Sequence, residues 1–342
     1  MVGVALLPLL SAAAPGGGGH SDAVAPVILA LAVILAGAKL GGDLATRAGQ
    51  PAVLGELVAG VVLGNLHLLG VPWFRAMAAN PTVDVLAQLG VLILLFQVGL
   101  ESTVRDMLKV GLRSLAVAVL GVVTPFALGW GVGAVLLPDH SPYVHAFLGA
   151  TLTATSVGIT ARVLSDLGKS RSAEARVILG AAVVDDVLGL VILAIVAGAI
   201  QAANLGQPMA VGAVAAVLLK AIVFLGGALA LGTALSPRLF HLTSLLRGRG
   251  VLLTTALVFC FVLAYLASAI GLAPIVGAYA AGLILEDLHW RDFTERGEHR
   301  LEELIQPVAT LLVPVFFVLM GMRVDLAAFA RADVLGLAAL LT

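Results

Sequence analysis

Ten long apolar runs decide what this chain of 342 residues can fold into. Runs of about 17–25 apolar residues match the thickness of the hydrocarbon core of a bilayer. Because only helices and closed barrels satisfy their backbone hydrogen bonds in lipid, such runs predict transmembrane helices. The ten runs are 24–46, 51–67, 83–101, 112–136, 144–167, 176–200, 209–235, 251–269, 272–288 and 304–322, and an eleventh begins near Asp333.

The composition supports an all-α polytopic membrane protein. The chain is 61% hydrophobic and only 11% charged, a balance that does not suit a domain surrounded by water. Its 39 glycines favour close packing of helices within lipid. A net charge of −1 offers no basic surface for nucleic acid, and the single Cys260 excludes an intrachain disulfide. We therefore expect one membrane transport domain over residues 24–342.

Residues 1–23 form a separate N-terminal segment. Residues 1–14 are apolar and end in small residues, but they lack the positive region that a signal peptide needs. The alternatives are a signal peptide and an extra-membrane or partly inserted terminus, and the second is favoured. The glycines at 16–19 are typical of a flexible linker.

The basic residues indicate the orientation in the membrane. Of 19 Lys and Arg, most lie in one set of alternate loops: Arg47, Arg105, Lys109, Arg113, Lys169, Arg171, Arg176, Arg238, Arg247, Arg249, Arg291, Arg296 and Arg300. Arg75, Arg323 and Arg331 lie in the other set, and Lys39, Arg162 and Lys220 lie inside spans. The positive-inside rule then places the N-terminus outside the cell.

Two segments indicate an inverted repeat. LGVLILLFQVGLES at 89–102 and TLLVPVFFVLMGMRVD at 310–325 are both apolar runs that end in Phe, Gly and a charge. On the loop count above, the first runs inward and the second runs outward. Opposite orientation of similar segments is typical of the two halves of a secondary transporter.

Two adjacent carboxylates, Asp185 and Asp186, lie in the middle of the sixth span. Each charge there costs about 2.5–3.5 kcal/mol, so their presence predicts a function. Neighbouring helical positions differ by about 100° in direction, so the two groups should have separate roles. Burial and mutual repulsion favour protonation of at least one of them, where a cation could compete with the proton.

The preceding span contains TLTATSVGIT at 151–160, which is too polar for an ordinary lipid-facing helix. We expect this helix to be interrupted, so that its carbonyls and the hydroxyls of Thr155 and Ser156 can coordinate Na⁺. The alternative is that the Ser and Thr side chains bond back to their own helix or join neighbouring helices. Glu56 and Gln97 also lie within spans, and for these helix packing and a gating function are both open.

At this point several motifs resemble a known family. They are PAVLGELVAGVVLGN at 51–65, ATSVGITARVL at 154–164, VVDDVLG at 183–189, IVGAYAAGLILE at 275–286 and PVFFVLMGMRVDL at 314–326. Together they resemble the cation:proton antiporters of the second bacterial branch, specifically the NapA type, from about residue 25 onward. The resemblance implies an inverted-repeat sodium/proton antiporter fold, a homodimer and a location in the inner (plasma) membrane.

The resemblance also assigns residues. It implies that Asp186 binds Na⁺ and the proton, with Thr155 and Ser156 nearby, and that Asp185 pairs with a Lys in the second half. That Lys would follow the segment 314–326 on the eleventh span, but the sequence stops at Thr342. We therefore expect the second repeat to be incomplete in these residues, as in a fragment or a truncated product.

The function expected is secondary antiport, not enzymatic catalysis, and it needs no organic cofactor. Na⁺, with Li⁺ or K⁺ as alternatives, would be exchanged for H⁺ by alternating access. A potassium efflux system or channel of the same superfamily is the second hypothesis. A Gln-Asp pair in place of Asp185 and Asp186 would favour it. An intramembrane aspartyl protease is the third, but its aspartates must lie on facing helices, whereas Asp185 and Asp186 are neighbours.

Overall fold

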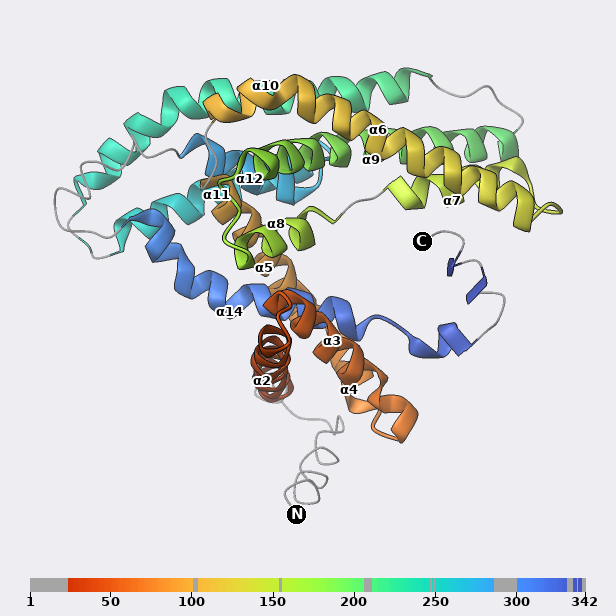
Figure 1. Cartoon of the computed structure of the whole chain (residues 1–342). Helices are drawn as coiled ribbons and strands as arrows, with labels where there is room; N and C mark the ends of the chain where they lie inside the picture. The colour runs from red at the N-terminus through yellow and green to blue at the C-terminus, as the bar shows by residue number, and fades with distance from the viewer. Residues whose placement is uncertain are drawn as a thin grey trace, which may run out of the picture. The chain divides into compact units, whose positions relative to one another are not determined.

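The computed structural model describes residues 24–100, 104–153, 156–205, 211–246, 248, 250–285, 300–330, 335–336 and 338–339 (Figure 1). Within these ranges the chain forms helices and turns and contains no strand. The predictions made for residues 1–23 lie outside the described part of the chain.

The long helices follow the predicted apolar runs. In the first half they are α2 (Val24–Arg47), α3 (Ala52–Asn65), α5 (Pro81–Leu100), α6 (Val104–Leu136), α7 (Pro142–Thr153) and α8 (Val157–Asp166). In the second half they are α9 (Ala173–Leu205), α10 (Val211–Ser244), α11 (Val251–Ala269), α12 (Pro274–Ile284) and α14 (Leu301–Met322). Among the described residues, seven helical stretches are long and apolar enough to cross a membrane. The predicted all-helical membrane fold is thereby confirmed.

Several bounds differ from the predicted spans. Helix α6 begins at Val104 and helix α10 continues to Ser244, each beyond its apolar run. Both contain an internal proline, Pro125 and Pro237, which the helices accommodate. Three short elements were not predicted: η1 (Leu66–Leu69), α4 (Trp73–Ala78) and η2 (Leu326–Ala330). Apolar runs measure the lipid-crossing part of a helix, so they miss extensions and short turns outside it.

The chain divides into two compact units. Unit 1 is Met1–Val91 with Ala309–Arg331, and unit 2 is Leu92–Val308 with Ala332–Thr342. Residues of α5 and α14 therefore belong partly to each unit.

Unit 1 is held together by close approach of small residues. Its core brings together buried residues of α2, α4, α5 and α14, including Ile34 and Val318, both 0% exposed. A Cβ on Gly60 would collide with the carbonyl oxygen of Val318, and one on Gly64 would collide with that of Met322. Since lipid provides no hydrophobic drive between helices, this backbone contact supplies the packing that joins α3 to α14.

Unit 2 contains the predicted polar residues of the sixth span. Helix α9 packs against α6, α7 and α8, and α11 packs against α12. A Cβ on Gly99 would collide with the carbonyl oxygen of Tyr279, so α5 and α12 also meet backbone to backbone. The contacts of α9 with α6, α7 and α8 determine the surroundings of the acidic pair.

Candidate ion-binding site

The predicted interruption of the fifth span is present. Helix α7 ends at Thr153 and helix α8 begins at Val157. Ser156 lies between them with φ −82° and ψ 96°, an extended conformation that no helix continues through. Residues 154 and 155 lie outside the described part of the chain, and so does the prediction for Thr155. β-Branched threonines and the competing hydroxyls make this segment a poor helix former, which explains why the helix breaks here.

Ser156 acts as the N-cap of α8. Its hydroxyl oxygen accepts a hydrogen bond from the backbone N–H of Ile159 at 3.4 Å, and its carbonyl oxygen accepts one from the hydroxyl of Thr160 at 3.1 Å. An N-cap satisfies one of the four N–H groups that the start of a helix leaves without a partner. The exposed Ser156 therefore has an oxygen at the break whose position is fixed by the helix.

Two other threonines of the segment bond within their own helix. The hydroxyl of Thr151 donates to the carbonyl oxygen of Leu148, and that of Thr153 donates to the carbonyl oxygen of Ala150, each at 2.8 Å. The hydroxyls of Thr151 and Thr153 therefore bond back to carbonyls of their own helix, as the alternative interpretation of the sequence predicted. A hydroxyl that donates its proton in this way still has lone pairs on its oxygen, so it can face a cation.

The two ends that meet at the break differ in charge. A helix leaves the carbonyls of its last turn and the N–H groups of its first turn without partners in the same helix, so α7 ends in carbonyls at the break and α8 begins there with N–H groups. The helix dipoles add partial negative charge at the first end and partial positive charge at the second. The α7 end is therefore suited to a cation. At the α8 end, the hydroxyl oxygen of Ser156 already accepts a hydrogen bond from one of the N–H groups.

The acidic pair lies in the middle of α9. Asp185 is buried, with 6% of its surface exposed, and Asp186 is the next residue of the same helix. The side chain of Asp186 lies outside the described part of the structure. Because α9 packs against both α7 and α8, the acidic helix and the broken helix are neighbours within unit 2. A buried carboxylate next to an interrupted helix provides the hard oxygen ligands that alkali cations prefer.

The start of α9 lies before the apolar run and is capped in the ordinary way. Ser172 accepts a hydrogen bond from the backbone N–H of Ala175 at 3.1 Å. The pKa of the Glu174 carboxyl is lowered, first by the backbone N–H of Glu174 itself and then by the hydroxyl of Ser172. Glu174 is fully exposed, so this acid is distinct in kind from the buried Asp185.

The other polar residues predicted within spans occupy different surroundings. Glu56 is buried in α3, with 4% exposed, and belongs to unit 1. Gln97 of α5 donates from Nε2 to Oε1 of Gln306 in α14 at 2.8 Å, and both residues belong to unit 2. Gln97 thus joins two helices. Sequence reasoning did not identify Gln306, because nothing in the sequence indicates a partner 209 positions away.

Three basic residues were predicted within spans: Lys39, Arg162 and Lys220. Arg162, near the end of α8, forms an ion pair with Asp166 at 2.8 Å. Lys39 in α2 and Lys220 in α10 are exposed. Among the described residues there is no group of three or more His, Cys, Asp or Glu side chains that could hold a metal ion in the manner of a structural site.

Comparison with known proteins identifies the family. Residues 30–342 match the family described as "Sodium/hydrogen exchanger, transmembrane". The chain belongs to this family. The resemblance of its motifs to cation:proton antiporters is therefore confirmed.

Several relatives of this exchanger are named as antiporters. It is 38% identical to the "High-affinity Na(+)/H(+) antiporter NhaS3" of Synechocystis, over 88% of this chain and 69% of that protein. It is 35% identical to the "Na(+)/H(+)-K(+) antiporter GerN" of Bacillus cereus, over 86% of this chain and 70% of that protein. Among solved structures, the sodium proton antiporter MjNhaP1 of Methanocaldococcus jannaschii matches with a TM-score of 0.58 at 18% identity, covering 90% of this chain and 73% of that one. This structural likeness shows the antiporter fold.

Proposed function

We propose that this exchanger moves Na⁺ and H⁺ in opposite directions through a site formed by Asp186 of α9 and the break between α7 and α8. In this proposal Asp186 binds either the cation or the proton, and oxygens of Thr155 and Ser156 complete the cation's coordination. Asp185 is the second carboxylate of the site, and the resemblance assigns it a Lys partner in the second half of the fold.

The chemistry follows from competition for one carboxylate. A desolvated Na⁺ needs a negative charge and hard oxygen ligands, and an ionised carboxylate supplies both. Once a proton occupies that carboxylate, the negative charge is lost and the cation is no longer held. If the empty, ionised site switches only slowly between its inward-facing and outward-facing states, each switch carries either Na⁺ or H⁺. The flows of the two ions are then coupled.

The observation that carries this proposal is the burial of Asp185 within a helix that packs against the interrupted α7 and α8. A buried carboxylate in a membrane helix is a functional site by default, because its insertion is unfavourable. An interrupted helix beside it gives polar backbone at the depth where ions bind in secondary transporters.

The second hypothesis, a potassium efflux system or channel, is not favoured. The two relatives from Synechocystis and Bacillus cereus are both named for Na⁺, and the second is also named for K⁺. The chain has Asp185 and Asp186 rather than the Gln-Asp pair that would favour potassium efflux. Protease chemistry is disfavoured further, since both aspartates lie on α9 and the named relatives are transporters.

The test uses the purified protein in proteoliposomes that contain a pH-sensitive dye. Addition of Na⁺ should release acid from the interior of the proteoliposomes, and additions of Li⁺ and K⁺ show whether these ions are exchanged too. Asp186→Asn should abolish the signal because an amide cannot release a proton. Asp185→Asn should retain exchange but alter the charge moved per cycle. Asp43→Asn is the matched control, because Asp43 pairs with Arg47 at an exposed end of α2. Exchange at the unmodified rate in Asp186→Asn would remove the proposed carrier.

Three further features complete the proposal. The charge bias of the loops supports an N-terminus outside the cell. The bacterial relatives support the plasma membrane as the location, and family resemblance supports a homodimer. Cross-linking of the purified protein, read as the mass of the linked species, tests the dimer.

A further inference from the structure

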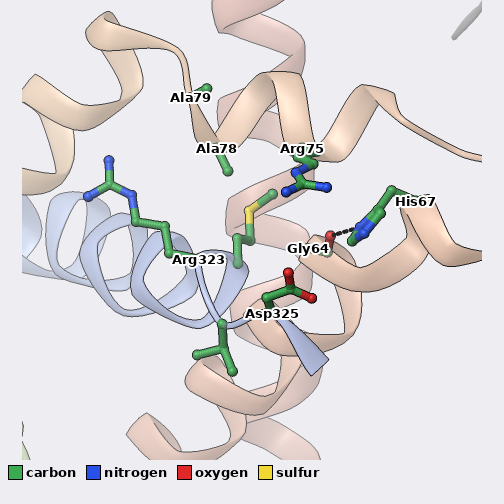
Figure 2. A pocket seen from close by; sticks show the side chains of 9 residues that line it. Gly64, His67, Arg75, Ala78, Ala79, Arg323 and Asp325 are labelled. Carbon is green, nitrogen blue, oxygen red and sulfur yellow. Dashed lines mark hydrogen bonds between the residues drawn. The ribbon is translucent and has the colours of Figure 1, made fainter. Parts of the chain in front are cut away.

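Unit 1 contains a pocket of about 320 Å³ at the ends of α3 and α14. Its floor is the close crossing of these helices, where Gly64 meets Met322. Its walls include the side chains of His67, Arg75 and Asp325 (Figure 2). None of these residues takes part in the transport site proposed above.

The pocket presents one positive and one negative group that are not paired with each other. Arg323, which also lines the pocket, forms an ion pair with Asp84 of α5, and Figure 2 shows it pointing away from Asp325. Figure 2 shows Arg75 above the opening and Asp325 across from it. Within the described part of unit 1, no ion pair involves Arg75 or Asp325. The pocket thus presents a positive and a negative group at separate places on its wall.

Two hydrogen bonds orient the other groups of the pocket. Nδ1 of His67 lies 2.9 Å from the carbonyl oxygen of Gly64, and since a carbonyl only accepts, Nδ1 is the donor and Nε2 remains for a ligand. Oδ1 of Asp325 accepts from the backbone N–H of Ala327 at 2.9 Å, which fixes the carboxylate at the rim. His67 and Asp325 therefore have defined positions before any ligand binds.

The surroundings are those of a membrane interface. Spans α3 and α14 both end at the pocket, so it lies where the hydrocarbon core gives way to headgroups. Next to His67, the apolar Leu68 and Leu69 are 56% and 79% exposed. Trp73 follows on α4 in an edge-to-face pair with Phe74, and tryptophan is enriched at this level of the bilayer. Exposed leucines beside a charged pocket suit a ligand that has both acyl chains and a polar head.

We propose that this pocket binds a lipid headgroup that contains a phosphate and a primary ammonium group, the chemistry of phosphatidylethanolamine. Arg75 holds the phosphate, because a guanidinium matches two phosphate oxygens at once. Asp325 accepts hydrogen bonds from the ammonium group, and Nε2 of His67 contributes a further polar contact. A headgroup with only a negative charge leaves Asp325 without a cationic partner, and a trimethylammonium group has no N–H to donate to it.

The test measures lipid binding and does not depend on transport. The delipidated protein in detergent is titrated with phosphatidylethanolamine, phosphatidylglycerol or phosphatidylcholine of the same acyl chains, and bound lipid is counted by native mass spectrometry. Phosphatidylethanolamine should bind most tightly to the unmodified protein. Arg75→Gln should weaken its binding about tenfold, equivalent to about 1.4 kcal/mol. Asp325→Asn should remove the preference for phosphatidylethanolamine over phosphatidylglycerol.

Two controls separate this result from general effects. Arg47→Gln removes an arginine at the end of α2, outside the pocket, and should leave lipid binding unchanged. Water-soluble phosphoethanolamine tests the contribution of the acyl chains, and it should not displace the lipid at equal concentration. The proposal is overturned if Arg75→Gln binds phosphatidylethanolamine as the unmodified protein does, if Asp325→Asn keeps the preference, or if the free headgroup competes equally. Circular dichroism of both variants verifies that each is folded.

Discussion

Gln97 and Gln306 join helices α5 and α14 through one hydrogen bond between their side-chain amides, at 2.8 Å. The two residues are 209 positions apart. Gln97 lies in the repeat segment 89–102, and Gln306 precedes the matching segment 310–325. Polar side chains that bond across helices hold membrane proteins together where lipid removes the hydrophobic drive. The pair therefore fixes α5 against α14 within unit 2.

A double-mutant cycle measures the strength of this bond. Gln97→Leu and Gln306→Leu should each lower the free energy of unfolding, and the double variant should lose less than the sum. The coupling expected is about 0.6 kcal/mol and at most about 1.7 kcal/mol, the range for such bonds within membranes. Unfolding in mixed micelles by a denaturing detergent gives the values. A coupling of zero would mean that the amides do not interact.

The crossing of α3 and α14 predicts the effect of adding one methyl group. Gly60→Ala places a Cβ against the carbonyl oxygen of Val318, so the helices must separate, at a cost of about 1–3 kcal/mol. Gly121→Ala on α6 is the matched control, because nothing lies within 4 Å of a Cβ there. The control should be neutral or more stable, since Ala favours a helix over Gly by up to about 1 kcal/mol. Equal stability of both variants would contradict the close packing.

The hydrogen bonds of Asn65 lead to a second prediction on the stability of unit 1. This buried residue donates from Nδ2 to the carbonyl oxygen of Val324 at 2.7 Å, and its Oδ1 accepts from the backbone N–H of Leu326 at 2.9 Å. It thus fastens the segment after α14 to the end of α3. Asn65→Ala should lower the free energy of unfolding by about 1–3 kcal/mol, because it removes two hydrogen bonds that each contribute about 0.5–1.5 kcal/mol. The exposed Gln50→Ala should have no measurable effect, and similar losses in both would show that Asn65 does not fasten this segment.

Much of the fold could be predicted from the apolar runs, because lipid imposes one length and one type of backbone structure on every span. The start of α2 at Val24 and the bounds of α11, Val251–Ala269, coincide with those runs. The helical continuation of α10 past Pro237 was missed, since the charge at Arg238 ends the apolar run but not the helix. The short α4 was missed because a helix of only six residues gives no periodic signal.

The candidate site was predicted less completely. The interruption before Val157 follows from local chemistry, because threonines and Gly158 disfavour a helix wherever they occur. The burial of Asp185 follows from its place in an apolar span. Contacts between distant residues, such as Arg323 with Asp84, depend on how helices pack, and a single sequence does not encode them in any local pattern.

The predicted orientation can be tested across one span. In a background with the buried Cys260 replaced by Ala, cysteines are placed at the exposed Asp139 and Lys169, which lie at opposite ends of the α7 and α8 pair. A membrane-impermeant maleimide added to intact cells should label Asp139→Cys and should label Lys169→Cys only after the cells are opened. The reverse pattern would invert the topology.

Competition between Na⁺ and H⁺ for one carboxylate can be measured as the initial rate of exchange at a series of pH values. If a proton and Na⁺ cannot occupy Asp186 together, lowering the pH raises the apparent KM for Na⁺, by up to about tenfold per pH unit where the proton dominates. The maximal rate at saturating Na⁺ stays nearly constant over the same range. We predict this dependence for the protein in proteoliposomes clamped at equal pH on both sides. An apparent KM for Na⁺ that does not change with pH, with a maximal rate that falls instead, would mean that Na⁺ and H⁺ do not compete for Asp186.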